Sequence, residues 1–347
     1  GGVAISPDGT TVAFQKRRTV WEDNGYDTEI WIAPASGAPY QLTRTIEGNS
    51  SSPAWSPDGR WLSFTANRGD RNQVYLISPS GGEAFVLTSV EGGVSSYAWS
   101  PSGGQMALRV TEPESEEDKT RQELYGDFAF DSETGRSAHL WVIDVDMVGE
   151  ASEPRRLTEG DFHVGSFSWS PDGSRVAYAR QPDPARLSSV ETDIYVLEVE
   201  SEESTPLVVG VGPDDSPTWS PDGRWVVYTA DYDGTRVQLE LLEVETGETR
   251  ALTDDAHVYS DPTFSPSGDR ISYVSTRPNG YFNVSVRPVD EGRWAGDEMP
   301  LTTDNTFGSN RLYFGPWDMP LTPTWLPEGD ELLLVSNRAV PLGSGNA

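Results

Sequence analysis

Short apolar and aromatic runs alternate with polar turns along the whole chain, and one phrase punctuates this pattern. An apolar or aromatic residue is followed by Ser-Pro-Asp-Gly or a near copy, and then by a run rich in β-branched and aromatic residues. The copies occupy residues 5–9, 55–59, 99–103, 169–173, 219–223, 264–268 and 325–329. Because proline presets φ and glycine supplies a left-handed position, each copy predicts a tight turn between two strands.

The second copy shows a whole repeat. Residues 52–55, 60–66, 74–77 and 84–88 predict four strands, here called A to D, joined by polar or glycine-containing turns. The same order recurs in six repeats, most of which close with a Leu-Thr pair, whereas the seventh has only strands A and B, at 322–325 and 331–335. Helical periodicity is absent, so the pattern predicts an all-β chain.

A repeat of roughly 45–70 residues is a supersecondary unit that must stack on its neighbours to bury its faces. We therefore predict a β-propeller of about seven four-stranded blades, six complete and the seventh partial, in a ring that is not fully closed. Residues 1–347 are predicted to form one propeller domain with insertions at 111–137 and 303–321. Because the chain opens on Gly-Gly-Val and ends in a Gly/Ser stretch, we expect it to be a piece of a longer protein.

The charge is strongly negative, with 25 basic and 55 acidic residues and a net charge of −30. Such a field repels polyanions, so a nucleic acid is not expected as a partner. Two interpretations stay open: a solvated acidic surface, or a mouth that attracts cationic groups. The chain has no cysteine and no stretch approaching the ~18 apolar residues of a membrane span. We predict neither a cofactor nor a tuned metal site.

In an up-and-down blade the A–B and C–D turns share one face, and the B–C and D–A loops share the other. The long loops fall on the second face, which we predict to be the binding face. In the loop 15–23, Arg17, Arg18 and Trp21 are candidates for binding a carboxylate against an aromatic shelf, with pairing to Glu22 or Asp23 as the alternative. In the insertion 303–321, the candidates are Arg311, Tyr313 and Trp317, which either bind a partner or plug the propeller.

No catalytic residue is predicted, because the chain has neither a Gly-x-Ser-x-Gly elbow nor a cysteine. His163 and His257 lie in predicted D–A loops that converge on the axis, and either share a ligand or form local hydrogen bonds. We expect His139, beside a C strand, to be structural. The acidic start of the insertion 111–137 is expected to be solvated.

The recurring Trp-Ser-Pro-Asp-Gly turn and Leu-Thr pair resemble the repeat of TolB-like β-propellers over essentially the whole chain. The segments 136–144 and 155–161 are similar to propellers of prolyl-oligopeptidase-type serine peptidases. The segments 312–318 and 336–345 resemble propellers attached to bacterial amidohydrolases. The resemblance implies a noncatalytic propeller that binds or gates substrate for a hydrolase domain in the same parent chain. The alternative is a TolB-type scaffold for a protein or peptide ligand, and either implies a periplasmic or secreted location.

Overall fold

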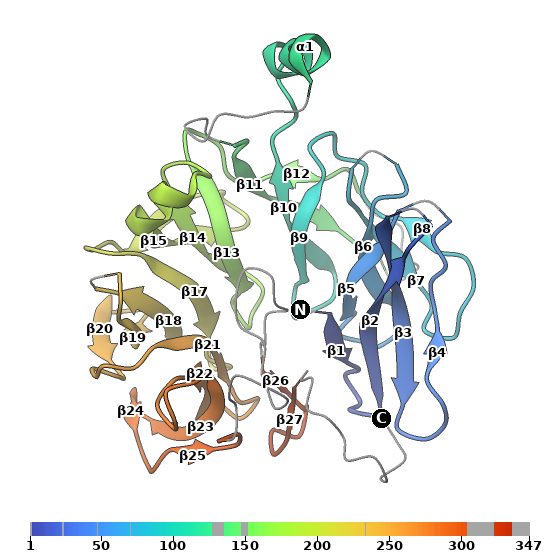
Figure 1. Ribbon diagram of the computed structural model, residues 1–347. Coiled ribbons are helices and arrows are strands. Elements are labelled where there is room, and N and C mark those ends of the chain that lie inside the picture. Colours follow the sequence, from blue (N-terminus) through green and yellow to red (C-terminus); the bar gives the residue numbers. More distant parts are fainter. Residues whose placement is uncertain are drawn as a thin grey trace. The chain divides into compact units, whose positions relative to one another are not determined.

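The computed structural model describes residues 2–22, 24–46, 48–69, 71–126, 135–146, 152–232, 234–303 and 323–334 (Figure 1). The chain divides into two compact units, one formed by Gly2–Pro206 and the other by Leu207–Ala347 together with Gly1. Each unit is described by itself.

The first unit is built from antiparallel sheets whose strands follow one another in chain order. The first sheet contains β1 (Val3–Ile5), β2 (Thr11–Val20), β3 (Gly25–Pro34) and β4 (Tyr40–Gln41). The second contains β5 (Ser50–Trp55), β6 (Leu62–Ala66), β7 (Gln73–Ile77) and β8 (Phe85–Val86). The third contains β9 (Val94–Trp99), β10 (Gln105–Thr111), β11 (Ala138–Asp144) and β12 (Arg155–Arg156). The fourth contains β13 (His163–Trp169), β14 (Arg175–Gln181), β15 (Asp193–Glu198) and β16 (Ser204–Val208).

The second unit continues the same pattern. Its first sheet contains β17 (Asp214–Trp219), β18 (Trp225–Asp231), β19 (Val237–Glu243) and β20 (Glu248–Ala251). The next contains β21 (Tyr259–Phe264), β22 (Arg270–Ser275), β23 (Asn283–Asp290), β24 (Arg293–Trp294) and β25 (Met299–Pro300). Its last described strands are β26 (Thr324–Trp325) and β27 (Leu332–Leu333), which pair with each other. Within the described residues the predicted order is confirmed: six repeats are complete, and the seventh shows its strands A and B.

The cores lie between consecutive sheets, as expected for blades that cannot bury their faces alone. One cluster joins Ile30 and Ile32 of β3 to Leu62 and Phe64 of β6. Another joins Leu140 of β11 to residues of β13, β14 and β15, and in the second unit a third joins Leu241 of β19 to residues of β21 and β22. The second strand of a sheet is often buried along its whole length, as β6 is. The all-β prediction is confirmed.

A helix interrupts this pattern in the connection between β10 and β11, where the acidic run predicted only solvated chain. Helix α1 (Glu116–Tyr125) follows Ser115, whose hydroxyl accepts the N–H of Asp118 at 3.0 Å and donates to its carboxylate at 2.7 Å. This is a helix N-cap with a reciprocal contact, and ion pairs from Lys119 to Glu116 and from Arg121 to Asp118 add support. A short 3₁₀ helix, η1 (Arg186–Glu191), precedes β15. Neither of these described helices has the length and apolar character needed to cross a bilayer.

The serine of the recurring phrase closes each turn. Ser170 accepts the N–H of Arg175 at 2.9 Å and donates its own proton to Asp172 at 2.6 Å. The serines of the other complete copies likewise accept an N–H five residues onward. Successive turns also touch within a unit, because a Cβ built on Gly103 would lie 3.3 Å from Cδ of Pro57. The phrase therefore fixes both the A–B turn and its contact with the preceding sheet.

The carboxylate of this turn should make stability depend on pH below about 4. Hydrogen bonds from Ser170 and Ser174 lower the pKa of Asp172 from 3.8 to about 2. A carboxyl whose pKa is lowered by folding stabilises the protein above its unfolded pKa, and this stability is lost as pH falls through the folded value. We expect Asp172→Asn to remove a contribution of less than about 1 kcal/mol, because the group is exposed. Urea unfolding of both proteins between pH 2 and pH 7 tests this, and parallel pH profiles contradict it.

Candidate binding surface

Arg17 and Arg18 lie in a strand and not in the predicted loop, which corrects the boundary drawn from the sequence. β2 and β3 form a long ribbon in which Arg17 pairs with Thr28 and Arg18 with Asp27. The flanking strands stop short of this end, since β1 pairs only with residues 12–14 and β4 only with residues 31 and 32. Among the described residues, no third strand pairs with the outer part of the ribbon.

The side chains of the ribbon stack across it. The guanidinium carbon of Arg17 lies 3.5 Å from the ring centroid of Tyr26, and the ammonium of Lys16 lies 4.4 Å from that of Trp31. Arg18 forms an ion pair with Asp27 at 2.7 Å, so its carboxylate partner is not the predicted Glu22. Asp23, the other predicted partner, lies outside the described residues. At the turn of the ribbon Trp21 is 86% exposed.

His163 also lies in a strand, because it opens β13 where a loop was predicted. Its Nδ1 accepts the N–H of Ala138 at 3.1 Å, and this bond ties the start of β11 to the neighbouring sheet. Burial lowers the pKa of His163 below its usual value, with Arg109 adding to the effect. The side chain is therefore neutral near pH 7 and serves as a hydrogen-bond acceptor.

His257 belongs to the other unit. Its N–H donates to Asp255 Oδ1 at 2.9 Å, and its carbonyl accepts from Gln238 Nε2 at 2.8 Å. Nδ1 lies 3.5 Å from the hydroxyl of Thr276. These contacts are local and match the alternative given for an isolated loop histidine. The other predicted residues, Arg311, Tyr313 and Trp317, lie outside the described residues.

His139 takes part in a hydrogen-bonded contact that recurs along the chain and that we call a staple, in which a threonine hydroxyl after the fourth strand binds a backbone N–H of the third strand. The hydroxyl of Thr158, from the Leu-Thr pair, accepts the N–H of Leu140 at 2.9 Å and lies 3.3 Å from Nδ1 of His139. The same threonine bond joins the third and fourth strands elsewhere, at Ile30–Thr43, Val74–Thr88, Leu239–Thr253 and Val284–Thr302. In three of these sheets the threonine also donates to the residue at the position of His139, namely Glu29, Gln73 and Asn283. His139 thus holds a structural position.

A cavity of about 680 Å³ lies beside His139 in the first unit. Its polar wall contains Glu112 and Arg156, whose Oε1 and Nη2 are 3.1 Å apart, and its apolar wall includes Val90 and Trp141. Nε2 of His139 lies 3.6 Å from Glu112, while burial and the nearby Arg156 lower the pKa of His139 to about 4. The sequence did not single out Glu112, Trp141 or Arg156 as site residues. The one signal was that the two segments used for the peptidase resemblance, 136–144 and 155–161, contribute His139, Trp141 and Arg156 to the lining of this cavity.

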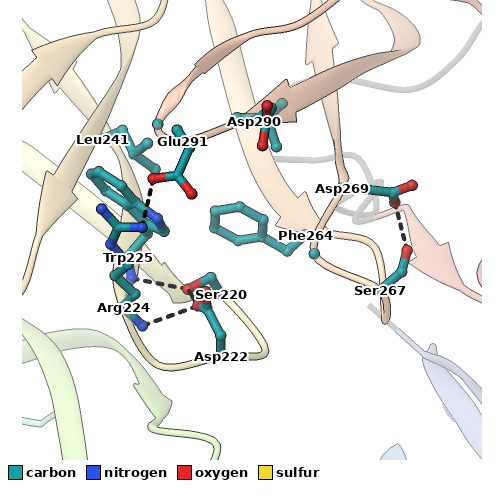
Figure 2. Close-up of a pocket in the computed structure, with 13 residues that line it drawn as sticks. Ser220, Asp222, Arg224, Trp225, Leu241, Phe264, Ser267, Asp269, Asp290 and Glu291 are labelled. Atoms are coloured by element: carbon teal, nitrogen blue, oxygen red, sulfur yellow. Dashed lines mark hydrogen bonds and ion pairs between the residues drawn. The ribbon is translucent and has the colours of Figure 1, made fainter.

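A second pocket, of about 240 Å³, lies between the Ser-Pro-Asp-Gly turns of two sheets in the second unit (Figure 2). Arg224 reaches across it to Glu291 at 2.7 Å and also pairs with Glu243 at 2.9 Å. The same guanidinium stacks on Trp225, 4.8 Å from its ring centroid. Arg224 is neutralised by two carboxylates of the same unit. Its ion pairs therefore hold two neighbouring sheets together at this pocket.

The acidic residues do not gather into a metal site in the part of the chain that the structure describes, where no three His, Asp or Glu side chains form a ligand set. Some described acidic residues are instead buried, namely Glu29, Asp214 and Glu240. Glu240 accepts a hydrogen bond from the hydroxyl of Tyr232, and burial raises the pKa of Glu240. Two candidate binding features therefore remain, both in the first unit. One is the outer ribbon of β2 and β3 with its basic and aromatic side chains, and the other is the cavity beside His139 with its polar and apolar walls.

Comparisons with known proteins agree with this architecture. A family model described as the TolB beta propeller domain matches residues 125–298, half of the chain. The chain is 30% identical to the uncharacterized peptidase YuxL of Bacillus subtilis over 66% of its length, and to dipeptidyl-peptidase 5 of Porphyromonas gingivalis over 69%. It spans only 29% and 38% of these two relatives. The structure of a putative TolB from Agrobacterium tumefaciens is 20% identical, with a TM-score of 0.53, and the match covers 86% of this chain and 94% of that one.

Proposed function

Because the chain belongs to the family of TolB β-propeller domains, we propose that it is the noncatalytic propeller of a peptidase and that it binds or gates peptide substrate for a catalytic domain in the same protein. The observation that carries the proposal is the pair of 30% identical relatives, both named as peptidases, of which the chain spans 29% and 38%. These relatives favour a peptidase over the amidohydrolase as the attached hydrolase. A periplasmic or secreted location is part of the proposal.

The test compares two proteins: the complete product of the gene and the 347 residues alone. We expect the complete product to hydrolyse dipeptidyl anilides or longer peptides, and the 347 residues to show no turnover on the same substrates. Adding the separate 347 residues to a trypsin digest of the same peptides is the control for nonspecific effects. Turnover by the 347 residues alone, or a complete product without peptidase activity, contradicts the proposal.

A second candidate is a scaffold of the TolB type that binds a protein or peptide without an attached hydrolase. The observation in its favour is that the structural match to this chain covers 94% of the putative TolB from Agrobacterium tumefaciens. Capture of a peptide by a complete gene product that has no hydrolase activity would favour this candidate over the first.

A further inference from the structure

A cavity of about 690 Å³ lies between the first two sheets, where their Ser-Pro-Asp-Gly turns face each other. Ile32, Pro34 and Trp55 belong to its apolar wall, and Asp8 and Asp58 belong to its polar wall. The pocket in Figure 2 has the same place between two turns of the second unit, but its volume is only about 240 Å³. The seam between the first two sheets, meaning the contact between these neighbours, is therefore less completely filled.

One position of the repeat accounts for this difference in volume. The second residue after the glycine of the phrase is Trp225 in the smaller pocket and Thr11 in the larger cavity. Across the seven copies, this position holds in order Thr11, Trp61, Gln105, Arg175, Trp225, Arg270 and Glu331. The first copy has the smallest of these side chains. The space that Trp225 occupies in its own seam is therefore left open beside Thr11.

The seam between the sixth and seventh repeats shows how an arginine fits at this position. Arg270 stands there in the place of Thr11, and its guanidinium carbon lies 5.3 Å from the ring centroid of Trp325. Its Nη2 also donates to the carbonyl of Gly329 at 2.6 Å. The tryptophan and the glycine of the following phrase thus form a stacking surface and a hydrogen-bond acceptor for one guanidinium.

The first seam contains the same two groups without the arginine. Trp55 and Gly59 are the counterparts of Trp325 and Gly329, and both line the cavity. The indole N–H of Trp55 donates to the carbonyl of Ala4 at 3.2 Å, which fixes the ring in place. Among the described residues, no cation lies over the ring of Trp55 and no donor reaches the carbonyl of Gly59. Both groups are therefore available to a ligand.

Two carboxylates in the wall of the cavity favour a cationic ligand. In the first turn, the hydrogen bonds from Ser6 and Thr10 all go to Oδ1 of Asp8. In the second turn, Oδ1 of Asp58 likewise accepts the bonds that hold the turn. Oδ2 of neither carboxylate accepts a hydrogen bond from the described residues, and Arg60, the one cation among the described lining residues, keeps its Nε 4.0 Å from Asp58 Oδ2. Within either unit, this seam is the one with aspartate in both facing turns.

Other contacts already hold the first seam together. The hydroxyl of Tyr40 donates to the carbonyl of Pro79 in the neighbouring sheet at 3.0 Å. Deeper in the seam, Ile32 packs in one cluster with Leu62 and Phe64. The seam therefore does not depend on a side chain in the cavity, and a ligand can enter without displacing a structural contact.

We propose that the cavity between the first two sheets binds the guanidinium of an arginine side chain from a peptide. The guanidinium stacks on Trp55 and donates to the carbonyl of Gly59, as Arg270 does in its own seam, and Asp8 and Asp58 balance its charge. This inference does not depend on the peptidase proposal, because it concerns binding by the 347 residues themselves.

The primary experiment titrates capped peptides into protein with isotope-labelled tryptophan and follows the indole signal of Trp55 by NMR. Acetyl-Gly-Arg-Gly-amide is compared with the same peptide containing citrulline, which keeps the shape of arginine without its charge, and with one containing lysine. Because both ends are capped, the side chain carries the only charge of the peptide. We expect the arginine peptide to bind at least roughly fivefold more tightly than either of the others. Loss of the signal in Trp55→Phe assigns it.

Protein variants give the second measurement. Thr11→Trp fills the cavity as Trp225 fills its own seam, so binding should fall at least roughly tenfold while the urea midpoint stays equal or rises. Asp8→Asn combined with Asp58→Asn removes both charges but keeps the Oδ1 acceptors of the turns, and it should weaken binding roughly fivefold. Asp172→Asn makes the same change in a turn that does not line the cavity, and this matched control should bind like the unmodified protein.

Equal affinity for the arginine and citrulline peptides, or an unshifted Trp55 signal at millimolar peptide, overturns the proposal. Equal affinity for the lysine peptide overturns the assignment to a guanidinium, and an equal loss in Asp172→Asn overturns the role of Asp8 and Asp58. Self-association in sedimentation that Thr11→Trp abolishes also contradicts the proposal, since the occupant is then a second copy of the chain. The peptide series uses the unmodified protein, so it decides the matter even where a variant perturbs the seam.

Discussion

Replacement of Trp169 by alanine is expected to lower the free energy of unfolding by about 3–5 kcal/mol. Trp169 is 8% exposed and packs in the cluster that joins the third and fourth sheets. Its indole N–H also donates to the carbonyl of Ala98, in the first strand of the preceding sheet, at 3.1 Å. The substitution thus removes a large apolar contact and a hydrogen bond at one seam between blades. Urea unfolding followed by circular dichroism measures the loss.

The equivalent tryptophans show that this contact belongs to the repeat. Trp55 donates to the carbonyl of Ala4, Trp99 to the hydroxyl of Ser63, and Trp325 to the carbonyl of Thr263. Trp169→Phe is the matched control, since it keeps most of the ring and loses the N–H, and it should cost about 1–2 kcal/mol. A loss below about 1 kcal/mol for Trp169→Ala would mean that the tryptophan does not hold the seam.

The strands of the repeat could be predicted because each repeat carries its own turn sequence between strands A and B. The phrase at 55–59 places β5 and β6 on either side of a turn, and the structure has β5 ending at Trp55 and β6 starting at Leu62. The outer ribbon was missed for the opposite reason. Lys16 to Val20 have no buried face, so no apolar alternation marks them as a strand, and their pairing with Gly25 to Glu29 is visible only in the structure.

Helix α1 was not predicted because its sequence is mostly charged, although it carries a local signal for a helix start. Its run is polar except for Leu124 and Tyr125 at its end, so no apolar periodicity marks it. Ser115 followed by Asp118 is nevertheless a capping pattern that the sequence contains. The histidines illustrate a different limit. The sequence indicates the segment in which His163 lies, but its role depends on Nδ1 meeting the N–H of Ala138, twenty-five residues earlier. Contacts of this range follow from sheet packing, which a single sequence does not specify.

The structural role of His139 could have been inferred from the sequence by comparing the repeats with one another. The residue before the buried third-strand position is polar in several sheets, as Glu29, Gln73 and Asn283 are. Aligning the repeats on their Leu-Thr pairs brings these residues into one column with His139. A column of hydrogen-bonding side chains beside a constant threonine indicates a staple and argues against a catalytic histidine.

Gly212→Ala should be at least as destabilising as the loss of Trp169, because this glycine combines two constraints. Its φ is +96°, a conformation that costs an alanine about 1–2 kcal/mol. A Cβ at this position would also lie 1.9 Å from the carbonyl oxygen of Asp231, at the end of β18. Backbone atoms must then move apart, and the N–H of Asp231, which donates to the carbonyl of Pro213 at 3.0 Å, moves with them. We expect a total loss of about 3–5 kcal/mol in urea unfolding.

Gly234→Ala separates the two constraints within the same unit. Gly234 has a φ of +76° and no atom within 4 Å of the position of a Cβ. It should therefore lose only the conformational part, about 1–2 kcal/mol. The difference between the two variants measures the close approach of the loop before β17 to the end of β18. Equal losses for Gly212→Ala and Gly234→Ala would show that this approach relaxes without cost, and that the first connection of the second unit is not held in place by backbone contact.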